Sequence, residues 1–162
     1  MTEYNIFADP EAAQKVLTSD LKITLVPLDV CENNIFADSM LTRDHLSDLR
    51  YQAKGEMIDY LCDKYPIYID MWREYFQLGG FPMDDVITAA LALDDSLCHY
   101  TEPVHVEVEL EGRLTRGQII PFFGYQINKY PEKERRNVRI AVSIEGKLFM
   151  NLFTDTLIKG CR

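Results

Sequence analysis

A helix that is apolar on nearly every side constrains this chain more than any other feature of its sequence. Residues 83–93 read Met-Asp-Asp-Val-Ile-Thr-Ala-Ala-Leu-Ala-Leu, and apolar side chains occur at almost every phase of the helical turn. A helix without a broad polar face belongs in the interior of a protein, so we expect it to be buried. The fold must therefore cover this helix on more than one side.

Two adjacent carboxylates, Asp84 and Asp85, stand at the start of this helix. One interpretation is capping, because an aspartate at a helix start accepts backbone N–H bonds and suits the positive end of the helix dipole. The other is a hard-cation site, for which carboxylate oxygens are the preferred ligands. Taken alone, the pair favours capping, since acidic helix starts are common.

Helical and alternating patterns on both sides of this helix predict an α/β fold. We expect strands at 21–30, 104–110, 113–120 and 138–144, with Val142 facing inward and His105 outward. Helices are expected from Pro10 with Asp9 as cap, over about 43–50 with Thr42 as cap, and over 147–159. We expect loops at 31–41 and 129–136.

Proline and glycine place two further boundaries. Pro66 is expected to separate a helix at 53–64 from a second helix, which the Gly79-Gly80 pair should end. The second helix carries an aromatic stripe that is more typical of core packing than of a platform for stacking bases. This stripe consists of Tyr68, Ile69, Trp72, Tyr75 and Phe76.

Composition excludes several classes of protein. The 162 residues suit one domain with a substantial core, and the net charge of −9 argues against nucleic acid and anionic membranes as partners. The four cysteines are widely spaced without a CxxC pair, which disfavours a zinc site or a disulfide framework. With no secretory signal and no long apolar run, the expected compartment is the cytoplasm.

Several segments, in this order, resemble one family of enzymes. They are the segments at 3–13 (Glu-Tyr-Asn-Ile-Phe-Ala-Asp-Pro-Glu-Ala-Ala), 25–30 (Leu-Val-Pro-Leu-Asp-Val), 83–93 (the apolar helix), 101–117 (Thr-Glu-Pro-Val-His-Val-Glu-Val-Glu-Leu-Glu-Gly-Arg-Leu-Thr-Arg-Gly) and 137–142 (Asn-Val-Arg-Ile-Ala-Val). Together they are similar to the C-terminal half of the inosine-uridine preferring nucleoside hydrolases, which are calcium-dependent N-ribohydrolases. The resemblance covers most of the chain.

The resemblance implies a Rossmann-like open mixed sheet flanked by helices, represented by its C-terminal portion, and a site at the carboxyl ends of its strands. It places the family's ribose-binding segment on Glu3, Tyr4 and Asn5, and one calcium ligand on Asp85. We therefore expect Asn5 and Asp85 to lie within one ligand's width of each other. It implies ribonucleosides such as inosine and uridine as ligands, and a possible homo-oligomer.

The chain departs from the family pattern in two ways. Many relatives carry a histidine before the calcium-binding aspartate, where this chain has Asp84; an ionised carboxylate is a poor proton donor, so help to the leaving base from Asp84 is doubtful. The family's aspartate cluster, of the form DxDxxxDD, supplies most calcium ligands and the general base, and it does not occur here. That cluster belongs to the half of the family fold that holds the central parallel strands. Without this half, we expect the strand near Ile23 to Val30 to leave an unpaired edge and an exposed apolar face, which predicts poor solubility or self-association.

Three interpretations follow. The first is a nucleoside hydrolase represented by half of its fold, which would need the other half for activity. The second is a non-catalytic ribose-binding or interaction module that descends from the family. The third is an unrelated α/β domain whose acidic helix start is only a cap.

Overall fold

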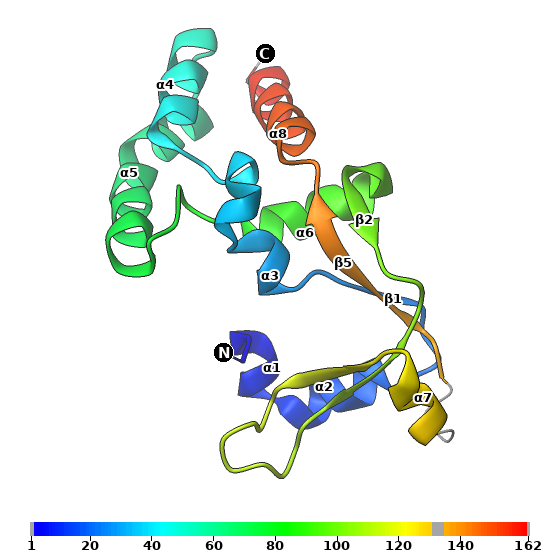
Figure 1. Ribbon diagram of the computed structural model, residues 1–162. Coiled ribbons are helices and arrows are strands. Elements are labelled where there is room, and N and C mark those ends of the chain that lie inside the picture. The colour runs from blue at the N-terminus through cyan, green and yellow to red at the C-terminus, as the bar shows by residue number, and fades with distance from the viewer. Residues whose placement is uncertain (1, 131–134, 162) are drawn as a thin grey trace. The chain divides into compact units, whose positions relative to one another are not determined.

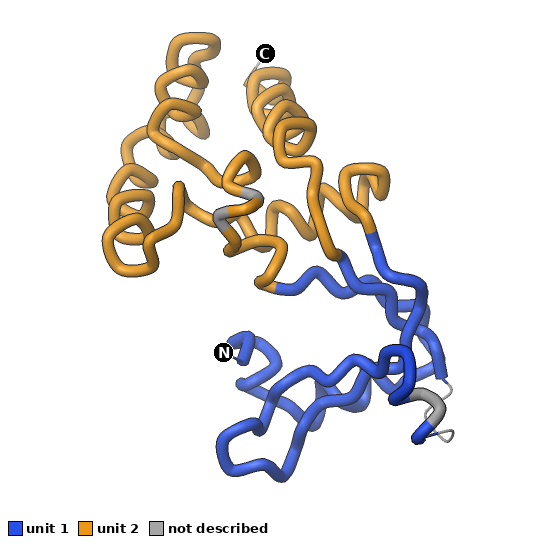
Figure 2. Tube along the Cα trace, viewed as in Figure 1, with its two compact units in different colours: residues 1–27, 100–141 blue, residues 28–99, 142–162 orange. Residues whose placement is uncertain are grey.

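The computed structural model describes residues 2–130 and 135–161. Its helices and strands make an α/β fold, as the sequence predicts (Figure 1). The chain divides into two compact units, each built from two separate stretches of sequence (Figure 2). Unit 1 contains residues 1–27 and 100–141, and unit 2 contains residues 28–99 and 142–162. The single domain expected from the chain length stays a prediction.

Unit 1 pairs two short N-terminal helices with a β-hairpin. Helices α1 (Tyr4–Ala8) and α2 (Pro10–Leu17) come first, and strands β3 (His105–Val108) and β4 (Ile119–Phe122) form the antiparallel hairpin. Helix α7 (Tyr125–Lys129) follows. As predicted, the Asp9 carboxylate caps α2 by accepting the Ala12 N–H at 3.0 Å. The core of unit 1 consists of Leu17, Val104, Val106, Val108 and Val138.

Three strands form a sheet in the order β1-β5-β2, made of β1 (Ile23–Leu25), β5 (Val138–Ile144) and β2 (Cys98–Tyr100). Strand β1 runs parallel to β5, with Ile23 opposite Val138. Parallel pairing here and antiparallel pairing in the β3–β4 hairpin confirm the expected mixture of strand directions. The boundaries predicted for β5 are those observed.

Asn137 fixes the start of β5. Its side-chain amide donates to the backbone carbonyls of Leu17, Ser19 and Leu21, each at 3.1 Å. This one side chain therefore satisfies the carbonyls along the connection from α2 to β1, which lacks a regular ladder of its own.

Unit 2 is mainly helical. Thr42 caps α4 as predicted, in a capping box in which its hydroxyl accepts the His45 N–H and the His45 ring accepts the Thr42 N–H. Ile58, Ile87 and Phe149 are completely buried. The helices are α3 (Leu28–Cys31), η1 (Asn34–Ser39), α4 (Arg43–Gln52), α5 (Glu56–Phe76), α6 (Asp84–Leu93), η2 (Asp95–Leu97) and α8 (Gly146–Gly160).

The predicted helix break at Pro66 is wrong. Helix α5 runs through Pro66 without interruption. A proline inside a helix costs about 3 kcal/mol. Burial of Ile58 and Ile69 on either side of it outweighs that cost, and the Arg43 guanidinium donates to the Pro66 carbonyl at 3.5 Å. Tertiary packing therefore overrides the local signal.

The glycine pair does not end α5 either. The helix ends at Phe76, and Gln77 takes the left-handed conformation at its C-cap. Gly80 has another role, since a Cβ there would lie 2.6 Å from the Leu41 carbonyl oxygen. Leu41 and Phe81 exchange two backbone hydrogen bonds of 2.9 Å at this point. The glycine allows two backbones to approach closely.

Other boundaries also differ from the prediction. The strand predicted at 21–30 is confined to β1, because Pro27 cannot donate to a ladder and α3 begins directly after it. The 31–41 segment holds η1 rather than a plain loop. The strand predicted at 113–120 is wrong over 113–118, which belongs to the turn between the strands, and β4 covers Ile119–Phe122 instead. Of the loop predicted at 129–136, residues 131–134 lie outside the described residues.

Burial is less complete than the apolar pattern suggests. Helix α6 buries Ile87, Ala90 and Leu91, whereas Val86 is 39% exposed and Leu93 is 85% exposed. The helix is therefore covered on one face only, and the prediction that it is buried all round is wrong.

Two strand residues and the aromatic stripe also differ from prediction. Val142 is exposed, and His105 is buried because its ring packs edge-on against Phe122 from the paired strand. Of the stripe on α5, only Ile69 is fully buried, whereas Tyr68, Tyr75 and Phe76 are exposed, so core packing does not explain it.

No helix in the described ranges is long and apolar enough to cross a membrane.

Candidate functional site

The first candidate segment forms helix α1 and its cap. Glu3 is the N-cap residue, in extended conformation. Its Oε1 accepts the Asn5 backbone N–H and its Oε2 accepts the Ile6 backbone N–H, both at 2.9 Å. The carboxylate therefore satisfies two of the N–H groups that a helix start leaves without partners. Glu3 has a structural role whether or not it also binds a ligand.

The same carboxylate orients the side chain of Asn5. The Asn5 Nδ2 donates to Glu3 Oε1 at 2.9 Å. This bond turns the amide oxygen away from Glu3 and leaves the second N–H of the amide for another acceptor. Asn5 is exposed and thus offers one acceptor and one donor to solvent. A vicinal diol, in which each hydroxyl donates and accepts, matches this pair of groups.

Tyr4 lies on the outer side of α1. Its side chain is 78% exposed. Nothing in the described residues of unit 1 holds its ring, so its assignment to the ribose-binding segment stays a prediction.

The second candidate segment is the start of α6. Met83 is the N-cap residue and makes no side-chain capping bond, and the two aspartates occupy the first two helical positions. The aspartates therefore follow the N-cap position rather than occupy it. Both carboxylates still lie at the positive end of the helix dipole.

The two carboxylates differ in their surroundings. Asp85 is exposed and makes no hydrogen bond or ion pair with the part of the chain that the structure describes. Asp84 is half-buried and contacts the buried thiol of Cys31. Burial, followed by the charge of Asp84, raises the pKa of this thiol to about 12. Asp84 is thus engaged inside unit 2, whereas Asp85 is available to a ligand.

The residues at the starts of α1 and α6 belong to different units. Glu3, Tyr4 and Asn5 lie in unit 1, and Asp84 and Asp85 lie in unit 2. The approach of Asn5 to Asp85 stays a prediction.

A complete metal site is not formed by the described residues alone. Residues 2–130 and 135–161 contain no cluster of three or more histidine, cysteine, aspartate or glutamate side chains suited to a metal ion. Calcium takes six to eight oxygen ligands. The Asp85 carboxylate has the right chemistry for one of them, so the chain fits as a contributor to a calcium site and not as the whole of one.

Sequence reasoning missed two contacts that shape these segments. One is the contact of Asp84 with Cys31, which are 53 positions apart in sequence. The other is the ion pair of Arg116 with Glu11, whose Nη2 and Oε1 atoms lie 2.6 Å apart. Neither has a periodic signature, because both join elements that only the tertiary fold brings together.

Comparison with known proteins decides the family. The family model described as inosine-uridine preferring nucleoside hydrolase matches residues 1–151. The chain belongs to this family. The protein named "Probable uridine nucleosidase 2" of Arabidopsis thaliana is 30% identical to it over 98% of this chain and 48% of its own length. The inosine-uridine preferring nucleoside hydrolase of Crithidia fasciculata is 28% identical over 97% of this chain and 46% of its own length.

Solved structures of the family share the fold. The structure of the purine-preferring ribonucleoside hydrolase from Gardnerella vaginalis superposes on this chain with a TM-score of 0.79 at 27% identity. The superposition covers 99% of this chain and 46% of the Gardnerella chain. The chain thus spans about half the length of the relatives it matches. This agrees with the half of the family fold expected from the sequence, and it rules out the unrelated α/β domain.

Proposed function

We propose that this chain is the ribose-binding half of a nucleoside hydrolase, which cleaves the N-glycosidic bond of ribonucleosides to ribose and free base. The observation that carries the proposal is the family match over residues 1–151, which includes both candidate segments. Inosine and uridine are the proposed substrates, by the printed description of the family. A cytoplasmic location and a homo-oligomer remain predictions.

The chemistry of α1 supports a ribose-binding role. Cleavage of the N-glycosidic bond develops oxocarbenium character on the ribose, so the sugar must be held in one orientation against the attacking water. The Asn5 amide, turned outward by its bond to Glu3, offers a donor and an acceptor to adjacent hydroxyls. Glu3 and Asn5 therefore bind and orient the sugar.

Asp85 is the proposed metal ligand of this half. Its carboxylate is exposed and is not engaged by another described side chain. Calcium, when bound, lowers the pKa of a coordinated water and orients it. The remaining ligands, and the general base, have to come from an aspartate cluster outside these 162 residues.

The test is release of free base from inosine and uridine, with calcium or with a chelator. The assay uses the chain alone and the chain mixed with the N-terminal half of the Crithidia fasciculata relative. Asp85→Asn should lower calcium-dependent release at least about tenfold, since even a residue that only supports a metal ligand contributes this much. Asp44→Asn is the matched control, because Asp44 is also an exposed aspartate at the second position of its helix, α4. Equal release from both variants would contradict the role of Asp85.

A second function is favoured by one observation. Asp84 stands where many relatives carry a histidine, and an ionised carboxylate is a poor proton donor to a leaving base, which suits a non-catalytic module that binds ribonucleosides. That function predicts binding of inosine or uridine that a chelator does not change, with no base released under any condition. Calcium-dependent turnover would exclude it.

A further inference from the structure

The loop that joins β3 to β4, residues 109–118, is closed by its own hydrogen bonds. The Glu109 carboxylate accepts the N–H groups of Glu111 and Gly112 at 2.8 and 3.0 Å, and these bonds lower its pKa. The Glu109 carbonyl accepts the Gly117 N–H at 2.7 Å. These contacts tie both ends of the loop together, so the loop has one shape rather than many.

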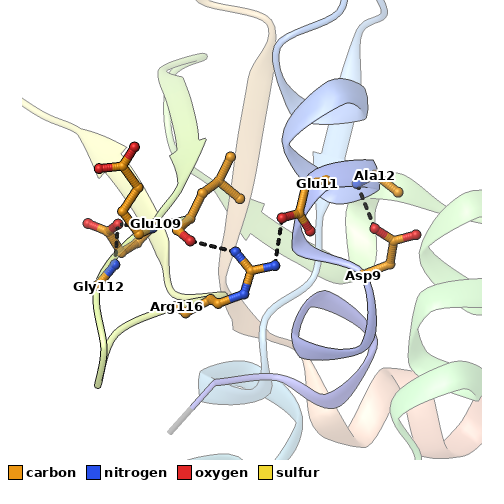
Figure 3. A network of polar contacts seen from close by, with 8 residues as sticks. Asp9, Glu11, Ala12, Glu109, Gly112 and Arg116 are labelled. Carbon is orange, nitrogen blue, oxygen red and sulfur yellow. Dashed lines mark hydrogen bonds and ion pairs between the residues drawn. The ribbon is translucent and has the colours of Figure 1, made fainter.

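Arg116 joins this loop to helix α2. Its guanidinium donates to the Leu110 carbonyl and to the Glu11 carboxylate, which lies in the first turn of α2 (Figure 3). An exposed ion pair contributes little free energy, but a guanidinium with two partners fixes the geometry between them. Gln14 adds a second link from α2, because its amide oxygen accepts the Val108 N–H just before the loop.

Gly117 brings the loop backbone against α1. Its φ angle is +85°, a conformation that favours glycine. A Cβ at this position would lie 2.9 Å from the Thr2 Cγ2 atom and 3.3 Å from the Phe7 Cα atom. The contact thus requires a residue without a side chain, and it lies directly on the backbone of the proposed ribose-binding helix.

We propose that this loop, residues 109–118, is a positioning element that holds α1 in the geometry needed to bind a ribonucleoside, with Arg116 and Gly117 as its positioning residues. This inference rests on the proposed role of Glu3 and Asn5. The α1 turn is closed by the Phe7 N–H donating to the Glu3 carbonyl at 2.9 Å, and by the Asn5 and Ile6 N–H groups donating to the Glu3 carboxylate. A side chain at position 117 would be strained by the positive φ and would press on the Phe7 Cα atom at 3.3 Å, so we expect Gly117→Ala to loosen that turn and the orientation of the Asn5 amide.

The first experiment is amide hydrogen exchange in the full chain carrying Gly117→Ala. We expect the Ile6 and Phe7 amides to exchange about tenfold faster than in the unsubstituted protein, because their hydrogen-bond acceptors lie on Glu3. Gly124→Ala is the matched control. Gly124 also has a positive φ, of +53°, but a Cβ there meets nothing within 4 Å. If both variants leave α1 equally protected, the loop does not hold the helix and the proposal fails.

The second experiment separates Arg116 from the loop's other arginine. Arg116→Gln should speed exchange at Phe7, whereas Arg113→Gln removes the same charge from an exposed side chain and should leave it unchanged. Arg116→Lys keeps a donor for Glu11 and should restore part of the protection. Equal effects of Arg116→Gln and Arg113→Gln would point to charge alone and would overturn the assignment of Arg116.

Titration with inosine and uridine, followed by the NMR shift of the Asn5 amide, completes the test. Gly117→Ala should weaken binding about tenfold relative to Gly124→Ala, measured at a temperature where both variants are fully folded. If the unsubstituted chain binds neither nucleoside, the proposed function of this half fails, whereas the exchange data still decide whether the loop holds α1. If it binds both and Gly117→Ala binds equally well, the proposed function stands and the positioning role is refuted.

Discussion

The buried thiol of Cys31 should make unit 2 less stable at alkaline pH. Cys31 is only 2% exposed, and burial together with the charge of Asp84 raises the pKa of its thiol from 9.0 to about 12. The pKa in the folded protein is above the value in the unfolded chain. The neutral thiol therefore contributes its full stability below pH 9, and this contribution is lost as the pH rises from 9 towards 12.

The size of this effect follows from the two pKa values. Between them the folded protein keeps a proton that the unfolded chain releases, so the free energy of unfolding falls by about 1.4 kcal/mol for each pH unit. The loss caused by this thiol is about 1.4 kcal/mol at pH 10 and about 2.7 kcal/mol at pH 11.

Urea unfolding at pH 8, 9, 10 and 11 measures this loss. Tyrosine and lysine side chains also titrate in this range, so the relevant quantity is the difference between the unsubstituted protein and Cys31→Ala at each pH. That difference should shrink by about 1.4 kcal/mol per pH unit above pH 9. Asp84→Asn should reduce the dependence, because the charge of Asp84 is the second largest cause of the raised pKa.

Asp85→Asn is the control for this series, because it removes a carboxylate from the neighbouring helical position that is not among the causes. If Cys31→Ala follows the same pH dependence as the unsubstituted protein, the Cys31 thiol does not cause the loss of stability. If Asp85→Asn flattens the dependence as much as Asp84→Asn, the charge of Asp84 is not what raises the pKa of the thiol.

Three further substitutions test the fold. Gly80→Ala should lower the free energy of unfolding, measured by urea titration, by about 1–3 kcal/mol, because its Cβ would meet the Leu41 carbonyl oxygen at 2.6 Å. Gly160→Ala is the control: a Cβ at position 160 has nothing within 4 Å, so this substitution should be neutral or stabilising. Asn137→Ala should cost about 1–3 kcal/mol by leaving backbone carbonyls without a donor, against little change for the exposed Asn151→Ala in the same assay. Because the pKa of Glu109 is lowered, its ionised carboxylate contributes to the stability of the fold above pH 4.5, and this contribution is lost as the pH falls. The difference in melting temperature between the unsubstituted protein and Glu109→Gln should therefore vanish in acid.

The sequence predicted those parts of the fold that local chemistry determines. Asp9 and Thr42 cap their helices as expected, and β5 has the predicted bounds, because capping and alternation are set by neighbouring residues. Pro66 shows where this reasoning ends, since packing of α5 on both sides of the proline outweighs a local preference. Gly80 likewise serves an approach of two backbones that sequence spacing does not reveal.

The candidate site was predictable to a lesser extent. Resemblance to the family gave Glu3, Asn5 and Asp85 as candidates, which lie within the matched residues 1–151 and whose roles stay predictions. The bond between Glu3 and Asn5 could not be foreseen, because it depends on the extended backbone at Glu3. The contact of Asp84 with Cys31 joins α6 to α3, and no spacing rule connects those positions.

The division of each unit into two stretches has a consequence for the order of synthesis. The core of unit 1 needs Leu17 from the beginning of the chain and Val138 from near its end. All of residues 28–99 leave the ribosome between these two stretches. Contacts this distant in sequence form slowly, because a long loop has to close before they can stabilise the chain. During synthesis α1 and α2 are therefore made well before the β3–β4 hairpin that packs against α2.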